Sequence, residues 1–171
     1  MTLSHHLAST SAYGRKLILV LAAIMTIGVA HAGTGGEERR NAELVRAAFT
    51  AWERGEGAVF DLLAPDIAWT IHGSGPVAGT YHGVDAFLER ASAPLVSRLA
   101  TPLVPRVHHI WADGERVIVR FDASATTTSG APYENRFVWI FRLEDGAVVE
   151  AEAFLDLIAY QQVVENNEPA N

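Results

Sequence analysis

The sequence predicts an α+β domain in which a curved, cone-shaped antiparallel sheet wraps around helices from the N-terminal half. Three observations support this. Helical periodicity marks segments of the N-terminal half, strand-like alternation recurs after Val104, and the turn signals Asp113-Gly114 and Asp145-Gly146 join the later strands. Strands joined by tight turns form antiparallel sheets, and helices gathered at one end of the chain must cover one face of the sheet.

Residues 1–32 have the composition of a secretory signal peptide. Arg15 and Lys16 precede an uncharged apolar run from Leu17 to Val29. Ala30-His31-Ala32 then gives the small-x-small pattern of a cleavage site. The alternative is an uncleaved anchor helix, but a helix that spans a bilayer needs roughly 20 apolar residues. We therefore expect cleavage after Ala32, a secreted or periplasmic protein, and no stable membrane anchor after cleavage.

Composition limits the partners and the chemistry. The chain has no cysteine, which excludes disulfides and lipid attachment through a thiol. Its formal net charge is −7, which argues against nucleic acid or an anionic membrane as the partner. We expect a linker over residues 33–38, one domain over residues 39–164, and a disordered tail over residues 165–171.

Two helices are predicted at the start of the domain. The first begins near Glu38 and ends at Gly55, a residue type that favours helix C-termini. Its apolar stripe consists of Leu44, Val45, Ala48, Phe49 and Trp52. A short helix follows from about Ala58 to Leu63. Trp52 and Phe60 belong to these stripes, where aromatic side chains serve either as core or as the lining of a cavity.

A strand from Ile67 to His72 comes next, with Trp69 on its apolar side. The glycine-rich stretch from Gly73 to Gly83 lacks the Gly-Lys-Ser/Thr and G-x-G-x-x-G spacings of phosphate-binding loops. A third helix begins near Val84, and Pro94 is expected to kink or end it.

Strand-like runs follow from Val104 to Trp111 and from Arg116 to Thr126, and a long hairpin spans Tyr133 to Asp156. In the hairpin's first strand, Asn135 shares one side with the aromatic residues Phe137, Trp139 and Phe141. If this side is buried, Asn135 lies at one end of an apolar wall.

The second strand of the hairpin supplies the candidate acid. If Phe154 faces the interior, Asp156 is a carboxylate that faces a hydrophobic cavity. Loss of hydration would then raise its pKa toward the range useful for proton transfer. The alternative is that the strand turns Asp156 outward beside Glu150 and Glu152, which share its parity.

Several segments resemble the nuclear transport factor 2-like superfamily, with its cystatin-like fold, and within it the SnoaL-like, ketosteroid-isomerase-related proteins. Together they extend from about Arg39 to Val164. The matching segments are Asn41–Glu53, Leu63–Trp69, Ala78–Gly83, Tyr133–Arg136, Asp145–Val148 and Phe154–Asp156.

The resemblance implies a curved sheet around a mostly apolar pocket, a homodimer through the outer face of the sheet, and neither metal nor organic cofactor. Asp156 matches the aspartate that acts as general acid/base in the SnoaL-type cyclases. The ketosteroid isomerase base would lie near Ile71 and His72, where this chain has no carboxylate. One fold hosts many functions, so the reaction is not implied.

The other candidate site residues have two interpretations each. His72 is either a partner base or a histidine at a strand end. Asn135 orients a substrate carbonyl, holds Asp156, or caps the strand. Tyr81 supplies a phenol donor or packs at the rim of the pocket.

The sequence argues against two other kinds of site. Neighbouring residues on a strand point to opposite faces, so His108 and His109 do not chelate one metal together. No G-x-S-x-G motif and no cysteine supports a nucleophilic hydrolase.

The sequence thus predicts an exported domain that binds a small apolar carbonyl-type molecule. The expected pocket residues are Trp52, Phe60, Trp69, Tyr81, Phe137, Trp139 and Phe154. Proton-transfer catalysis of the isomerase, cyclase or lyase type, with Asp156, His72 and Asn135, is one hypothesis. The alternative is a ligand-binding or dimerisation module without catalysis.

Overall fold

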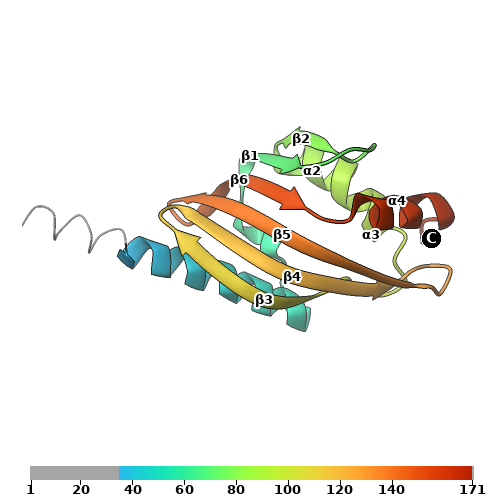
Figure 1. Cartoon of the computed structure of the whole chain (residues 1–171), viewed down its shortest axis with the longest axis horizontal. Helices are drawn as coiled ribbons and strands as arrows, with labels where there is room; N and C mark the ends of the chain where they lie inside the picture. The colour runs from blue at the N-terminus through green and yellow to red at the C-terminus, as the bar shows by residue number, and fades with distance from the viewer. Residues whose placement is uncertain (1–34, 171) are drawn as a thin grey trace, which may run out of the picture. The chain divides into compact units, whose positions relative to one another are not determined.

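A computed structural model describes residues 35–170 of the chain (Figure 1). The compact unit is Glu37–Asn171, and of the preceding segment, Met1–Gly36, only residues 35 and 36 are described. The expected signal peptide therefore lies outside the described residues, and its cleavage stays a prediction. No helix in the described part of the chain has the length and apolar character needed to cross a membrane.

The described chain begins with a helix over residues 35–54. Residues 35–38, expected as a linker, belong to its first turns. Asn41, Val45 and Phe49 are buried at a spacing of four, so they form one face of the helix. Gly55 ends it with a φ of 70°, the left-handed conformation that glycine adopts without strain.

The other elements keep the labels of Figure 1. In chain order they are η1 (Val59–Leu62), β1 (Leu63–Ile71), β2 (Gly79–His82), α2 (Val84–Phe87), the π-helical turn η2 (Leu88–Ser92), α3 (Ala93–Val96), β3 (Val104–Asp113), β4 (Arg116–Thr126), β5 (Pro132–Glu144), β6 (Ala147–Phe154) and α4 (Leu157–Asn166).

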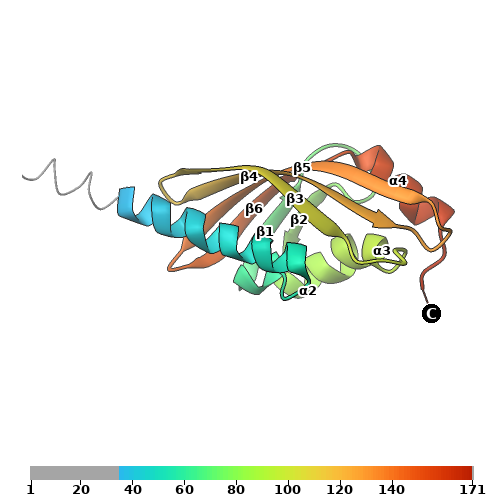
Figure 2. The same ribbon diagram turned by 90° about the horizontal axis from the view of Figure 1, so that it is seen from below.

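The six strands form one curved, open sheet in the order β2-β1-β6-β5-β4-β3 (Figure 1). The β1–β6 pair is parallel and every other neighbouring pair is antiparallel. Figure 2 shows the helix over residues 35–54, α2 and α3 on the same side of the sheet. This is the α+β architecture that the sequence predicts.

The register assigns alternate residues of each strand to opposite faces. Val119, Trp139 and Ala153 lie in one cross-strand row and are buried on the concave, helix-covered face. The next row, Ile118, Ile140 and Glu152, belongs to the convex face and is only partly buried. The core therefore lies between the concave face and the helices, where Phe49 packs edge-on against Phe121 at 5.0 Å.

Some predicted elements differ from the structure. β1 already begins at Leu63, and the expected second helix is the single 3₁₀ turn η1. The glycine-rich stretch contains β2, whose Tyr81 pairs with Trp69 of β1. The third helix continues beyond Pro94 through the π-helical turn, because Pro94 lies in the first turn of α3, where proline is tolerated.

The C-terminal segment corrects the expectation of a disordered tail. The helix α4 extends to Asn166, and the residues after it hydrogen-bond to the rest of the domain. Arg98 Nε donates to the Asn167 carbonyl at 2.8 Å, and the Ala170 amide donates to the Ser97 carbonyl at 2.7 Å. The polar composition of the tail suggested that its backbone groups would be hydrated, but these groups bond to the domain instead.

Candidate functional site

An apolar pocket of about 350 Å³ lies on the concave side of the sheet. Within the described part of the chain, its lining contains no Asp, Glu, His, Lys or Arg side chain. The lining residues are Trp52, Phe60, Trp69, Ile71, Phe87, Leu88, Ala91, Ser92, Leu95, Val96, Pro102, Leu103, Phe137, Trp139, Ala153, Leu155 and Tyr160.

Aromatic rings form the inner walls of this pocket. Trp69 stacks on Phe87 with ring centroids 4.1 Å apart, and its ring is nearly perpendicular to that of Trp139, with centroids 5.0 Å apart and an angle of 86°. Trp52 lies nearly parallel to Trp139, with centroids 6.0 Å apart and an interplanar angle of 13°. Rings that pack in this way hold one another in place, so the walls of the pocket are largely preformed.

The pocket has few polar groups. The Tyr160 hydroxyl donates to the carbonyl of Ala91 at 2.9 Å, and Ala91 belongs to the π-helical turn η2. Burial raises the pKa of the Tyr160 hydroxyl, so it remains a neutral phenol over the physiological range. Single π-helical turns occur frequently at functional sites, which is consistent with a pocket beside this segment.

Asp156 does not face the apolar pocket, which corrects the orientation expected from the sequence. Its side chain is exposed and is the N-cap of α4. Asp156 Oδ1 accepts hydrogen bonds from the backbone amides of Ile158 at 2.9 Å and Ala159 at 3.1 Å. Because β6 ends at Phe154, strand alternation does not reach Asp156.

Asn135 is buried and joins β5 to the start of α4. Its Nδ2 donates to the Tyr133 hydroxyl at 3.0 Å and to the Asp156 carbonyl at 2.9 Å. Its Oδ1 accepts from the amides of Asp156 at 3.0 Å and Arg136 at 2.7 Å. These four bonds use the two donors and both lone pairs of the amide, so none is left for a substrate. Asn135 holds the backbone of Asp156, one of the roles that the sequence left open.

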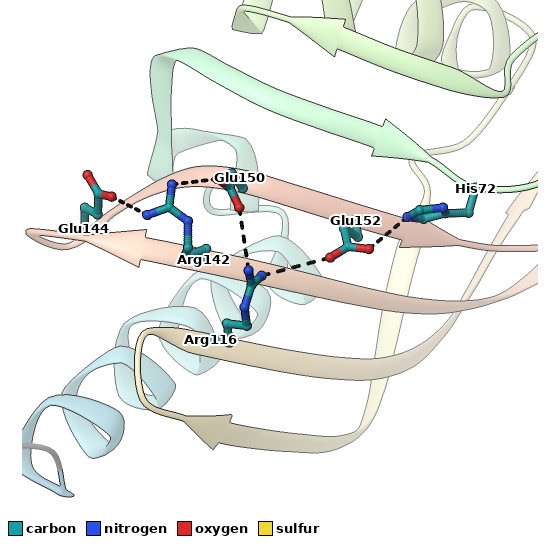
Figure 3. Close-up of polar contacts among 6 residues, drawn as sticks. All are labelled: His72, Arg116, Arg142, Glu144, Glu150 and Glu152. Carbon is teal, nitrogen blue, oxygen red and sulfur yellow. Dashed lines mark hydrogen bonds and ion pairs between the residues drawn. The ribbon is translucent and has the colours of Figure 1, made fainter.

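His72 belongs to the convex side of the sheet, away from the pocket. Figure 3 shows it at one end of a chain of ionic contacts that continues through Glu152 and Arg116. His72 Nε2 lies 2.9 Å from Glu152 Oε2, and its ring stacks on Phe154 at 4.5 Å.

The same ionic chain continues to the hairpin turn between β5 and β6 (Figure 3). Arg116 contacts Glu150 at 3.7 Å, and Arg142 contacts both Glu150, at 2.8 Å, and Glu144. The hydrogen bond from Arg142 lowers the pKa of Glu150. The chain therefore lies along the convex face, with the sheet between it and the pocket.

Two expected pocket residues lie elsewhere. Tyr81 is buried, but its hydroxyl donates to the Val77 carbonyl at 2.8 Å and it is not part of the lining. Burial raises its pKa, and the Arg90 guanidinium partly opposes this shift. Phe154 is 41% exposed on the convex face. Trp52, Phe60, Trp69, Phe137 and Trp139 do line the pocket.

Comparison with known proteins identifies the family. The family described as SnoaL-like domain matches residues 45–151. The chain belongs to the SnoaL-like family. No curated protein matches it.

Solved structures agree with this SnoaL-like fold. Bal32a, from a soil-derived mobile gene cassette, is 21% identical over 74% of this chain and 98% of its own, with a TM-score of 0.62. A nuclear transport factor 2-like protein from Burkholderia thailandensis E264 is 25% identical over 72% of this chain and 95% of its own, with a TM-score of 0.59. Another, of unknown function, from Burkholderia pseudomallei K96243, is 25% identical over 72% and 96%, with a TM-score of 0.60.

The SnoaL-like domain also has a larger, polar hollow of about 840 Å³ that Asn135 and Asp156 border. Its other lining residues are Glu53, Val104, Pro105, Arg106, Asp122, Ala123, Ser124, Glu134 and Arg136. Charged side chains dominate this lining, and the Asp122 carboxylate is already bonded to His108 at 2.8 Å and Arg120 at 2.6 Å. We take the apolar pocket as the candidate site because ligand pockets are mainly apolar with few polar groups.

Residues 35–170 contain no group of three or more His, Cys, Asp or Glu side chains that is arranged to hold a metal ion. His108 pairs with Asp122, whereas His109 stacks on Trp111 at 4.9 Å. The two histidines thus have separate partners.

The pocket wall supplied by α4 is not among the elements predicted from the sequence. Tyr160 and Val163 are buried at helical spacing, and Asp156 precedes them as a helix cap. An aspartate before apolar residues at helical spacing is a helix-start signal, so this helix was detectable. The hairpin predicted from Tyr133 to Asp156 places Asp156 on a strand instead.

Proposed function

We propose that this SnoaL-like domain binds a small, largely apolar molecule in the pocket on its concave face. The observation that carries the proposal is the lining, which is aromatic and aliphatic and lacks charged side chains among the described residues. A volume of about 350 Å³ falls in the range of small-ligand sites. Burial of apolar ligand surface against these rings would drive binding.

In this proposal the domain binds its ligand without acid–base chemistry from Asp156 or His72. Proton transfer requires a group within hydrogen-bond reach of the reacting atom. Asp156 caps α4 at the surface and His72 pairs with Glu152 on the convex side. Between the catalytic and the non-catalytic hypothesis, these placements favour the binding module.

A titration with a flat hydrocarbon tests the binding proposal. The probe is 2-isopropenylnaphthalene, and quenching of tryptophan fluorescence reports its binding. Ser92→Phe adds a ring to the pocket lining and is expected to weaken binding at least tenfold. Ser124→Phe adds the same ring beside the polar hollow and is expected to leave binding unchanged. Equal binding by the two variants, or none by the native domain, would contradict the proposal.

Two further variants separate binding from catalysis. Asp156→Asn and His72→Gln are expected to bind the probe as the native protein does. Mass spectrometry should recover 2-isopropenylnaphthalene, and its ketone analogue 2-acetylnaphthalene, unaltered after incubation. A chemical change in either probe that disappears in Asp156→Asn would restore the acid–base hypothesis.

We also propose that the convex face pairs with a second copy of the domain. Trp111 and Phe154 are 50% and 41% exposed there. The ionic chain beside them contains both signs of charge, so two such faces are able to complement each other. Trp111→Glu is expected to give a monomer in sedimentation experiments. Ile158→Glu, which changes an exposed apolar residue on α4, should not change the native mass.

Export is the last part of the proposed function. Residues 1–32 have the sequence pattern of a cleaved signal peptide. Expression of the full chain in a bacterial host should give a secreted or periplasmic protein whose N-terminal residue, by mass spectrometry, is Gly33. A mature protein that still begins at Met1 would contradict this.

A further inference from the structure

Trp69 has a buried polar atom without a partner. Its side chain is 1% exposed, and its indole Nε1 makes no hydrogen bond to any residue that the structure describes. An unpaired buried donor is unfavourable, and nearly all buried polar groups in folded proteins have a partner. This N–H group therefore needs a specific explanation.

The packing around Trp69 keeps the indole ring from turning toward another acceptor. Its backbone is held in β1 between Tyr81 of β2 and Ala151 of β6. Its ring is stacked on Phe87 and lies edge-on to Trp139. The orientation of the indole ring is therefore fixed before an acceptor arrives.

The pocket beside Trp69 supplies no charged acceptor of its own. Its lining lacks carboxylates among the described residues, and neither of its side-chain hydroxyls, Tyr160 and Ser92, is hydrogen-bonded to Nε1. The missing acceptor is therefore best supplied by a molecule that enters the pocket. The pocket also offers no cation to offset the desolvation of an anion, so the acceptor is a neutral oxygen.

We infer that the indole N–H of Trp69 selects ligands that carry a neutral acceptor oxygen, such as a ketone, quinone or ether, on a flat apolar body. This inference rests on the proposed function, because it concerns the same pocket. Nε1 is closed to water in the empty pocket, so the inference requires a neighbouring side chain to move when the oxygen arrives. Side-chain shifts of this kind are common on binding.

A rival explanation is that the face of Trp139 accepts the N–H as a weak hydrogen bond. The edge-on geometry, with centroids 5.0 Å apart, is compatible with such a contact. In that case an oxygen on the ligand would not increase its affinity through the Trp69 N–H group. The two explanations predict different spectra and different affinities.

The test uses a pair of probes that differ in one atom. In 2-acetylnaphthalene a carbonyl oxygen replaces the terminal methylene carbon of 2-isopropenylnaphthalene, and the shape is conserved. We expect the ketone to bind about threefold to tenfold more tightly, the ratio that one net hydrogen bond gives. Trp69→Phe should remove this preference and still bind the hydrocarbon. Trp111→Phe, the same substitution on the convex face, should keep the preference.

Nitrogen-15 spectra of the indole groups give the second readout. The chain has four tryptophans, so four indole signals are expected and Trp→Phe variants assign them. The Trp69 N–H proton should move downfield with the ketone and much less with the hydrocarbon. A Trp69 signal that responds equally to both probes, or a preference that survives Trp69→Phe, overturns the inference and leaves the proposed binding intact. Failure of both probes to bind overturns the proposed function, and the inference with it.

Discussion

The concave and convex faces of β4, β5 and β6 differ in chemistry although their residues alternate along the same strands. On the concave face Phe121, Trp139 and Phe141 are buried against the helices. On the convex face Arg142 and Glu152 belong to the ionic chain of Figure 3. A shift of one residue in a strand changes the face, so the two chemistries are kept apart by strand register alone.

This separation bears on mechanism. The apolar wall suits a hydrophobic ligand, whereas the histidine and carboxylates of the ionic chain lie on the other side of the sheet. A base on the convex face cannot reach a ligand on the concave face without passing through the backbone layer. The separation of the two faces therefore favours ligand recognition by packing and neutral hydrogen bonds over proton transfer.

The largest expected effect compares adjacent residues on the two faces. Phe141 is fully buried, and Phe141→Ala should lower the free energy of unfolding by about 3–5 kcal/mol. Ile140 is only partly buried, and Ile140→Ala should cost about 1 kcal/mol, roughly in proportion to the apolar area that it buries. Urea unfolding, followed by circular dichroism at low protein concentration, measures both. Equal losses would show that the convex face is as well covered as the concave one, and the comparison would fail.

The next effect concerns the junction of β5 with the start of α4, which Asn135 forms. Asn135→Ala removes four hydrogen bonds and leaves buried backbone groups unpaired, so it should cost about 2–3 kcal/mol. Asn166→Ala serves as the matched control, because Asn166 makes an exposed bond at the end of α4 and should change stability little. A small effect of Asn135→Ala would mean that water replaces the lost bonds, and that the amide is not essential to the junction.

The residues of this junction show what the sequence predicts and what it does not. Alternation predicted that Phe137 and Trp139 share a face with Asn135, and the structure agrees, because the pleat fixes the side of every residue inside a strand. Alternation could not place Asp156, because β6 ends two residues earlier and a helix begins. The alternation of side chains predicts which face a residue occupies only as far as the strand continues.

Long-range contacts explain the other differences. The parallel pairing of β1 with β6 joins segments about eighty residues apart, and no local signal in the sequence encodes it. That pairing turns His72 toward Glu152. The tail after α4 is ordered for a similar reason, since its partners, among them Arg98, are remote in sequence.

A smaller effect is expected from Asp156→Ala. Loss of the helix cap should lower the free energy of unfolding by about 1 kcal/mol, and Asp156→Ser should restore most of it. Binding of the naphthalene probes should be unchanged in both variants. If Asp156→Ala instead abolished probe binding at unchanged stability, Asp156 would belong to the site and the separation of the two faces would be wrong.

The smallest effect at neutral pH is expected from the convex carboxylate Asp122, because exposed ion pairs are weakened by solvent. Hydrogen bonds from His108 and Arg120 hold its pKa well below the ordinary value. An unfolded chain has aspartates with a pKa of about 3.9, so the unfolded state takes up this proton first as the pH falls. Asp122 therefore stabilises the fold above this pH, and that contribution is lost as the pH falls further.

The expected signature of Asp122 is thus a change in the shape of the stability curve. Melting temperatures measured from pH 7 to pH 2 should fall less steeply below about pH 4 in Asp122→Asn than in the native protein. Asp113→Asn, which removes an exposed carboxylate at the end of β3, should retain the native slope. If Asp122→Asn and Asp113→Asn gave the same curve, the bonds to His108 and Arg120 would contribute nothing in solution. The convex face would then differ from the concave face only in polarity, without a stabilising ionic structure of its own at this end of the sheet.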